Sequence, residues 1–147
     1  MKEAVLRFCL DRIRATIDDF TTNLNEVQES IETEEKSTMG DKYETGRAMA
    51  QQEQERIQRQ LGEARKDYQM LKNPSMSARH QKAQSGSLIT TDKRVIYLGP
   101  GMGVINVNGK SIITTSMQSP LAQVFLDCTK GDQVEFRGQT ETVLSVE

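Results

Sequence analysis

The sequence is poor in apolar residues and has no excess of positive charge. Hydrophobic residues make up 35% of the chain, the mean hydropathy is -0.61, and tryptophan is absent. Such a low apolar fraction indicates either disorder or a thin element wrapped by solvent, such as a coiled coil, rather than one compact globule. The formal net charge of -2 is not that of a protein with the basic surface of a duplex-DNA binder.

Long apolar runs, cysteine pairs and a leader-like start are also missing. No uninterrupted apolar stretch reaches the ~18 residues of a membrane span, and the charged residues Lys2, Glu3 and Arg7 exclude a signal peptide. Cys9 and Cys128 lie in different predicted domains, with no CxxC motif. They are expected to be reduced, half-buried thiols rather than a disulfide or a metal site. We therefore expect a cytoplasmic protein with no membrane partner.

The first half shows the heptad spacing of coiled-coil helices. Two registers alternate intervals of four and three residues, and neither glycine nor proline interrupts residues 2–39. The second register ends before Asn73-Pro74, because proline lacks an amide and disfavours a helical predecessor. The registers consist of Leu6, Leu10, Ile13, Ile17, Phe20, Leu24, Val27 and Ile31, and of Tyr43, Arg47, Ala50, Gln54, Ile57, Leu61, Ala64, Tyr68 and Leu71.

The two registers have similar lengths and a short connection at residues 37–40. This arrangement predicts an antiparallel coiled-coil hairpin over residues 1–73. The alternative is an intermolecular coiled-coil scaffold, which would double the mass in solution. We expect a monomer instead, because a turn separates the two registers.

The turn end of the predicted hairpin is acidic. Residues 26–44 contain seven acidic residues and two lysines, whereas arginine and lysine gather at the opposite end. Like charges at the end of a thin element repel one another and are relieved by a cation or a basic partner. An acidic coiled-coil surface is also a common solvated face, so charge alone leaves both interpretations open. The acidic residues are Glu26, Glu29, Glu32, Glu34, Glu35, Asp41 and Glu44.

The second half changes to short strands. Residues 74–86 are polar and predict a linker, in which His80, the only histidine, is expected to be solvated. Asn108-Gly109 is a strong hairpin signal, and Ser119-Pro120 predicts a helix start with serine as its cap. These signals predict a small β-rich domain over residues 87–147, and hence an α+β fold. The expected strands are 87–91, 94–98, 104–107, 110–115, 133–137 and 140–146, and the expected helix is 121–126.

Two motifs add a functional signal. At the predicted tip, the sequence Gly40-Asp41-Lys42-Tyr43-Glu44 has the form G-D-x-x-E, and the second domain contains Ser119-Pro120-Leu121-Ala122, followed by Phe125 and Gly131-Asp132. In this order and on this architecture, the chain resembles the bacterial transcript-cleavage factors of the Gre family over nearly its full length. The resemblance implies an N-terminal coiled-coil hairpin and a C-terminal FKBP-like domain.

The resemblance also implies a non-catalytic helper of RNA polymerase. In that family the hairpin enters the secondary channel of the polymerase, and the FKBP-like domain docks on the channel rim. Asp41 and Glu44 would share a Mg²⁺ ion with the polymerase and promote cleavage of backtracked RNA. The protein would bind no cofactor alone and would meet nascent RNA and DNA only within the polymerase complex. The implied polymerase contacts are Ser119, Pro120 and Leu121, and the implied further tip residues are Gly40, Tyr43 and Arg47.

The tip also departs from the family pattern. The classical loop continues with an asparagine and another acid, whereas this chain has Thr45-Gly46-Arg47. An inhibitor or regulator that binds the polymerase without stimulating cleavage is therefore the alternative. Asp41 and Glu44 would also form a capping box for the second helix, and Arg47 could pair with either of them or contact nucleic acid.

Two enzyme classes fit the sequence less well. A prolyl isomerase needs an apolar pocket lined by aromatic residues, and the second domain offers only Tyr97, Phe125 and Phe136. An acyl-transfer enzyme needs an activated nucleophile, but Cys128 has no histidine in its predicted domain. We therefore expect that the protein is not an enzyme and acts on the hydrolytic activity of the polymerase.

Overall fold

The computed structural model describes residues 1–35 and 40–147, and the side chains of residues 34–44 lie outside the description. The chain divides into two compact units. The sheet unit consists of Met1–Leu10 and Gln69–Glu147, and the hairpin unit is Asp11–Tyr68. This division differs from the predicted ranges 1–73, 74–86 and 87–147. The start of the first helix, the end of the second helix and the predicted linker all belong to the sheet unit.

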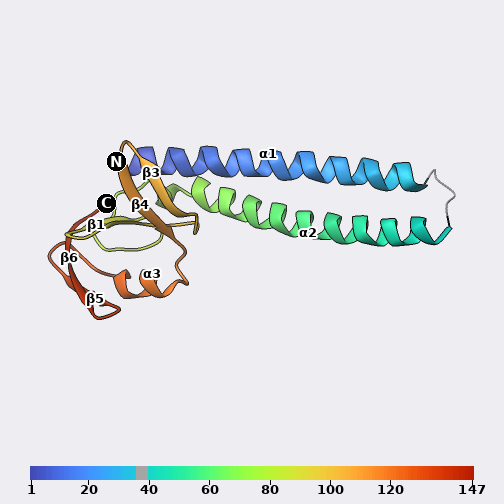
Figure 1. The fold of residues 1–147 in the computed structure, drawn as a ribbon. Helices are drawn as coiled ribbons and strands as arrows, with labels where there is room; N and C mark the ends of the chain where they lie inside the picture. Colours follow the sequence, from blue (N-terminus) through green and yellow to red (C-terminus); the bar gives the residue numbers. More distant parts are fainter. Residues whose placement is uncertain (36–39) are drawn as a thin grey trace. The chain divides into compact units, whose positions relative to one another are not determined.

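Two long helices, α1 (Lys2–Glu35) and α2 (Gly40–Lys72), run antiparallel and side by side in the hairpin unit (Figure 1). Their seam is built from the predicted heptad positions, all of which are buried or half-buried where their side chains are described. Proline at position 74 ends α2 as predicted, because Asn73 caps the following turn η1 (Pro74–Met76). The predicted helical hairpin is thus confirmed.

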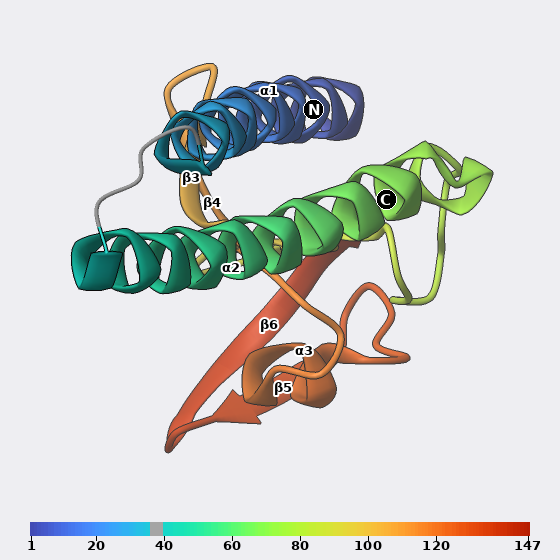
Figure 2. The same ribbon diagram turned by 90° about the vertical axis from the view of Figure 1, so that its right-hand side faces the viewer.

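The sheet unit contains six strands and a short helix, and each boundary lies within one residue of its predicted position. The strand order is β3-β4-β2-β1-β6-β5, and only the β2–β4 pair is parallel. Helix α3 lies beside β5 (Figure 2). The α+β fold is therefore confirmed. The elements are β1 (Leu88–Thr91), β2 (Val95–Leu98), β3 (Gly103–Val107), β4 (Lys110–Thr115), α3 (Pro120–Phe125), β5 (Gln133–Phe136) and β6 (Gln139–Val146).

Two tight turns fix the register of the outer hairpins. Asn108 and Gly109 join β3 to β4 with φ angles of 53° and 80°, as the sequence predicts for a two-residue hairpin loop. Arg137 and Gly138 join β5 to β6 in the same left-handed region, with φ angles of 52° and 78°. Arginine is an unusual residue there, so only the glycine gave a sequence signal for the second turn.

Apolar side chains cover both faces of the central strands. Ile89 and Ile96 belong to a core with Phe125 of α3, whereas the neighbouring Leu88 and Tyr97 are equally buried and point to the opposite face because side chains alternate along a strand. The first turns of α1 also belong to the sheet unit. There, Val5 and Cys9 are 0% exposed, whereas the predicted seam residues at positions 6 and 10 are only half-buried. Cys9 is thus more buried than predicted.

The prediction of a solvated linker at residues 74–86 is wrong. Met76 and Ala83 are 1% and 0% exposed, and His80 is only 7% exposed. The imidazole Nδ1 of His80 lies 2.8 Å from Ser87 Oγ. Gly86 has a φ of 89°, and a Cβ there would lie 2.8 Å from the Met76 Cα. The polar composition of residues 74–86 suggested a linker. The apolar residues Met76 and Ala83 of this segment are instead buried within the sheet unit.

Candidate functional site

The predicted acidic tip lies where α2 begins. The backbone of α2 starts at Gly40, so Asp41 and Glu44 are its second and fifth residues. Their side chains, like that of Tyr43, lie outside the described part of the structure. The metal-sharing role of the two carboxylates stays a prediction. The predicted capping box is wrong, because α2 already begins at Gly40 and Asp41 therefore lies inside the helix rather than before it.

The described residues nearest the tip form a polar stretch of the hairpin. Glu26, Glu29 and Glu32 are exposed on α1, as an acidic hairpin end requires. Arg47 is half-buried at its seam position and lines a shallow depression between the two helices. The predicted pairing of Arg47 with Asp41 or Glu44 involves side chains outside the described part of the structure. The depression is lined by Gln28, Ile31, Glu32, Arg47, Gln51 and Gln54.

The second predicted site is the loop that leads into α3. Ser119 has an extended backbone, and its Oγ accepts a hydrogen bond of 3.0 Å from the Ala122 amide. This confirms the predicted serine cap. Pro120 occupies the first turn and is exposed, whereas Leu121 is half-buried and packs against the α3 core. Of the three residues, Ser119 shapes the loop, Leu121 anchors it, and Pro120 presents its ring to solvent.

The turn after α3 is also well ordered by its side chains. Asp132 accepts a hydrogen bond of 2.8 Å from the Thr129 amide through Oδ2. Gly131 adopts a φ of 95°, which disfavours any side chain at that position. The second half of the predicted motif therefore has a structural role in holding the chain between α3 and β5.

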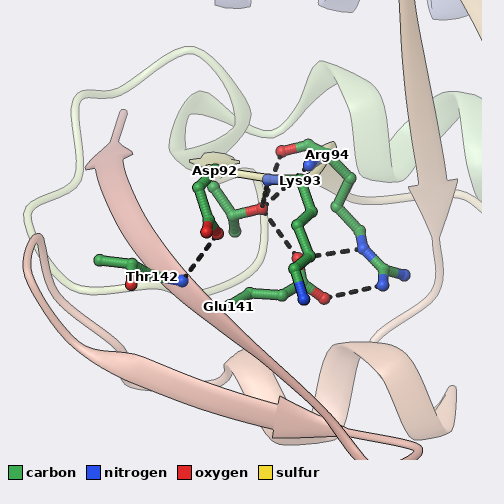
Figure 3. Close-up of polar contacts among 6 residues, drawn as sticks. Asp92, Lys93, Arg94, Glu141 and Thr142 are labelled. Atoms are coloured by element: carbon green, nitrogen blue, oxygen red, sulfur yellow. Dashed lines mark hydrogen bonds and ion pairs between the residues drawn. The ribbon is translucent and has the colours of Figure 1, made fainter.

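A buried ion pair in the sheet unit was not predicted from the sequence. Glu141 of β6 is 0% exposed, and Arg94, from the β1–β2 turn, donates a hydrogen bond of 3.0 Å from Nε to its Oε1 (Figure 3). Thr91 Oγ1 donates another of 2.8 Å to the same oxygen. The Nη2 of Arg94 lies 2.8 Å from Oε2, although Oε2 makes no hydrogen bond of good geometry with any described residue. That contact is therefore better described as an ion pair.

Neighbouring groups complete this cluster. Asp92 Oδ1 accepts a hydrogen bond of 2.9 Å from the Thr142 amide, which ties the β1–β2 turn to β6 (Figure 3). The guanidinium groups of Arg94 and Arg137 lie 6.0 and 5.0 Å from the centre of the Phe136 ring. One signal in the sequence could have predicted the burial of Glu141. Residues 141 and 143 lie on the same side of an extended strand, and Val143 is apolar, so that side is expected to face the core.

The residues considered for the alternative enzymes are not arranged as an active site. Tyr97 and Phe125 are fully buried in different faces of the sheet, so they do not line a shared open pocket. Burial raises the pKa of the Cys128 thiol to about 11, which makes it a poor nucleophile at neutral pH. Among the residues with described side chains, no group of three or more His, Cys, Asp or Glu could hold a metal ion.

No protein-family model and no curated protein matches this chain at a significant level. Within residues 1–35 and 40–147, neither long helix has an apolar stretch sufficient to cross a membrane. The function must therefore be inferred from the fold and from the two sequence motifs.

Proposed function

We propose that this protein binds bacterial RNA polymerase through the secondary channel and acts on backtracked transcripts as Gre-type factors do. One observation carries the proposal: the two motifs occur, in order, on a two-helix hairpin followed by a six-stranded sheet unit. The G-D-x-x-E motif opens α2, and the Ser119-Pro120 motif caps α3 with the proline exposed. The protein would act in the cytoplasm as a monomer and would bind no membrane.

The chemistry of the tip follows from its donor groups. Asp41 and Glu44 are three residues apart in one helical turn, a spacing that makes residues neighbours on a helix surface. Carboxylate oxygens are the ligands that Mg²⁺ prefers, so this pair suits an ion shared with the polymerase. When bound, such an ion supplies stabilisation for the attacking and leaving oxygens of phosphodiester hydrolysis. The protein itself would supply negative charge and position, and contacts with RNA and DNA would occur only inside the complex.

The loop before α3 supports a docking role. The polymerase would meet the exposed ring of Pro120, while the serine cap behind it keeps the loop in one conformation. A preorganised loop loses little conformational entropy on binding. The sheet unit would thereby hold the protein on the channel rim, and the hairpin would carry the carboxylates.

A second candidate function is inhibition without cleavage stimulation. It is favoured by Arg47, which places a base at a half-buried position of the hairpin seam, where the family loop has an acid. A cation so close in sequence to Asp41 and Glu44 would compete with Mg²⁺ for their negative charge. The two functions share a partner and differ in the effect of the tip on RNA hydrolysis.

Transcript cleavage in a stalled, backtracked elongation complex separates these functions. We expect wild-type protein to accelerate cleavage, and Asp41→Asn and Glu44→Gln each to remove the acceleration while binding is preserved. An amide keeps the size of the carboxylate but loses the charge that a hard cation requires. Raised Mg²⁺ should partly restore the rate by mass action. Asp18→Asn and Glu63→Gln are matched controls, since both residues are exposed in the hairpin unit and lie outside the acidic residues 26–44.

The opposite results are equally informative. Wild-type protein that binds the polymerase and leaves the RNA uncut over a Mg²⁺ series would support the inhibitor. In that case both tip substitutions should change only affinity. If the two control substitutions abolish cleavage as fully as the tip substitutions, the assignment of Asp41 and Glu44 is wrong.

A further inference from the structure

The seam of the hairpin unit changes in character along its length. In the half next to the sheet unit, α2 contributes Ile57, Leu61 and Ala64, which are 2–6% exposed. In the other half, none of the described seam residues is buried. We call the seven described seam residues of that half the distal seam: Phe20, Leu24, Val27 and Ile31 of α1, and Arg47, Ala50 and Gln54 of α2.

The distal seam is apolar on one side only. Leu24, Val27 and Ile31 are half-buried, and α2 supplies the polar Arg47 and Gln54 to the same seam. The shallow depression between Ile31 and Gln54 lies here, so side chains do not fill the seam to the density of a core. The apolar seam residues of this half are therefore removed from water less completely than those of the other half.

The half next to the sheet unit has additional contacts. Arg14 of α1 donates a hydrogen bond of 3.1 Å from Nη2 to the Tyr68 hydroxyl of α2. Its guanidinium also lies 5.6 Å from the centre of the Tyr68 ring. Most helical stability in proteins comes from packing of the apolar face rather than from helix propensity. The two halves of the hairpin unit therefore differ in what holds their helices together.

We propose that the distal half of the hairpin, residues 20–33 and 45–56, opens and closes as a separate unit of low stability. The half at residues 11–19 and 57–68 stays closed. Free energies of local opening range from near zero to the global value, in contiguous cooperative segments. Gln54 lowers the value here, because its partly buried amide gains little free energy when the seam closes.

The role of this opening rests on the proposed function. A polymerase channel that encloses the hairpin would bind the closed form, and apparent affinity falls in proportion to the fraction of closed molecules. Confinement by the channel would then close the distal seam. The opening itself is a property of the free protein and is measured without the polymerase.

Hydrogen–deuterium exchange of the full chain tests the proposal. In wild-type protein, amides of residues 20–33 and 45–56 should exchange at least about tenfold faster than those of residues 11–19 and 57–68, where tenfold corresponds to ~1.4 kcal/mol. Gln54→Leu should slow exchange in the distal half by about tenfold and leave the other half unchanged. Gln52→Leu is the matched control, because Gln52 is exposed on the same helix outside the seam.

Two results would overturn the proposal. One is equal exchange in both halves of the wild-type hairpin unit. The other is a Gln54→Leu variant whose distal exchange is unchanged or slowed no more than in Gln52→Leu. A protein that shows the expected exchange but does not bind RNA polymerase would retain the opening and refute the proposed function, so the two failures are distinguishable.

Discussion

Replacement of Arg94 by methionine should destabilise the sheet unit much more than replacement of Glu141 by glutamine. The Glu141 carboxylate is 0% exposed, whereas 24% of the Arg94 side chain is exposed. Arg94→Met leaves a buried charge with only the Thr91 hydroxyl as a described hydrogen-bond donor. Glu141→Gln leaves a cation that water can partly solvate, and the amide oxygen can still accept from Thr91.

The magnitudes follow from this asymmetry. Removal of one partner of a buried ion pair costs about 3–5 kcal/mol, and the partial exposure of Arg94 places Arg94→Met near 3 kcal/mol. Glu141→Gln loses charge-assisted hydrogen bonding and should cost about 1–2 kcal/mol. The double variant Arg94→Met/Glu141→Leu removes both charges together and should lie within ~1 kcal/mol of wild type, because an apolar pair of similar volume often replaces a buried ion pair without loss.

Urea denaturation followed by the NMR amide signals of β1 and β6 reports on the sheet unit alone. With a urea dependence of about 1–3 kcal/mol per M, Arg94→Met should lower the midpoint by roughly 1–3 M. Equal destabilisation by the two single variants would show that burial of Glu141 does not determine the free-energy cost of breaking the ion pair. A double variant less stable than Arg94→Met would show the same.

Two further predictions concern buried polar groups in the sheet unit. Tyr97 is 0% exposed, burial raises the pKa of its hydroxyl, and that hydroxyl has no hydrogen-bond partner among the described residues. Tyr97→Phe should therefore stabilise the unit by about 1 kcal/mol, and a loss of similar size in urea denaturation would show that a partner exists. Burial, and next the Lys2 ammonium, lower the pKa of His80 below its ordinary 6.5, so only the unfolded chain takes up the proton as the pH first falls below that value. The contribution of His80 to stability should be full above pH ~6.5 and should decline as the pH falls below that value. The His80→Gln variant should show a flatter profile, and identical profiles of variant and wild type would contradict the role of His80.

The local elements were predictable because their signals are local. Heptad spacing locates α1 and α2, and Asn108-Gly109 and Ser119-Pro120 locate a turn and a helix start with few residues each. Each signal depends on backbone preferences that act within one or two turns of chain. The boundaries of strands and of α3 therefore agree with the structure to within one residue.

The long-range pairings were not predictable in the same way. Arg94 meets Glu141 only because β1 and β6 are neighbours in the sheet, and strand order is not encoded in any local pattern. The burial of His80 similarly depends on Ser87 and on packing of the whole 74–86 segment. At the tip, the sequence identifies Asp41 by its motif, and the chemistry proposed for Asp41 requires a partner outside the chain.

Binding to core RNA polymerase is the most direct test of the proposed function. We expect labelled wild-type protein to bind the purified core enzyme, and Pro120→Ala to weaken binding at least about fivefold, which corresponds to the ~1 kcal/mol loss of an energetically important interface residue. Pro74→Ala is the matched control, because Pro74 is also exposed and also follows a capping residue. Retained binding by this control and loss by Pro120→Ala would support the account. Absence of binding by the wild-type protein at micromolar concentrations would contradict it.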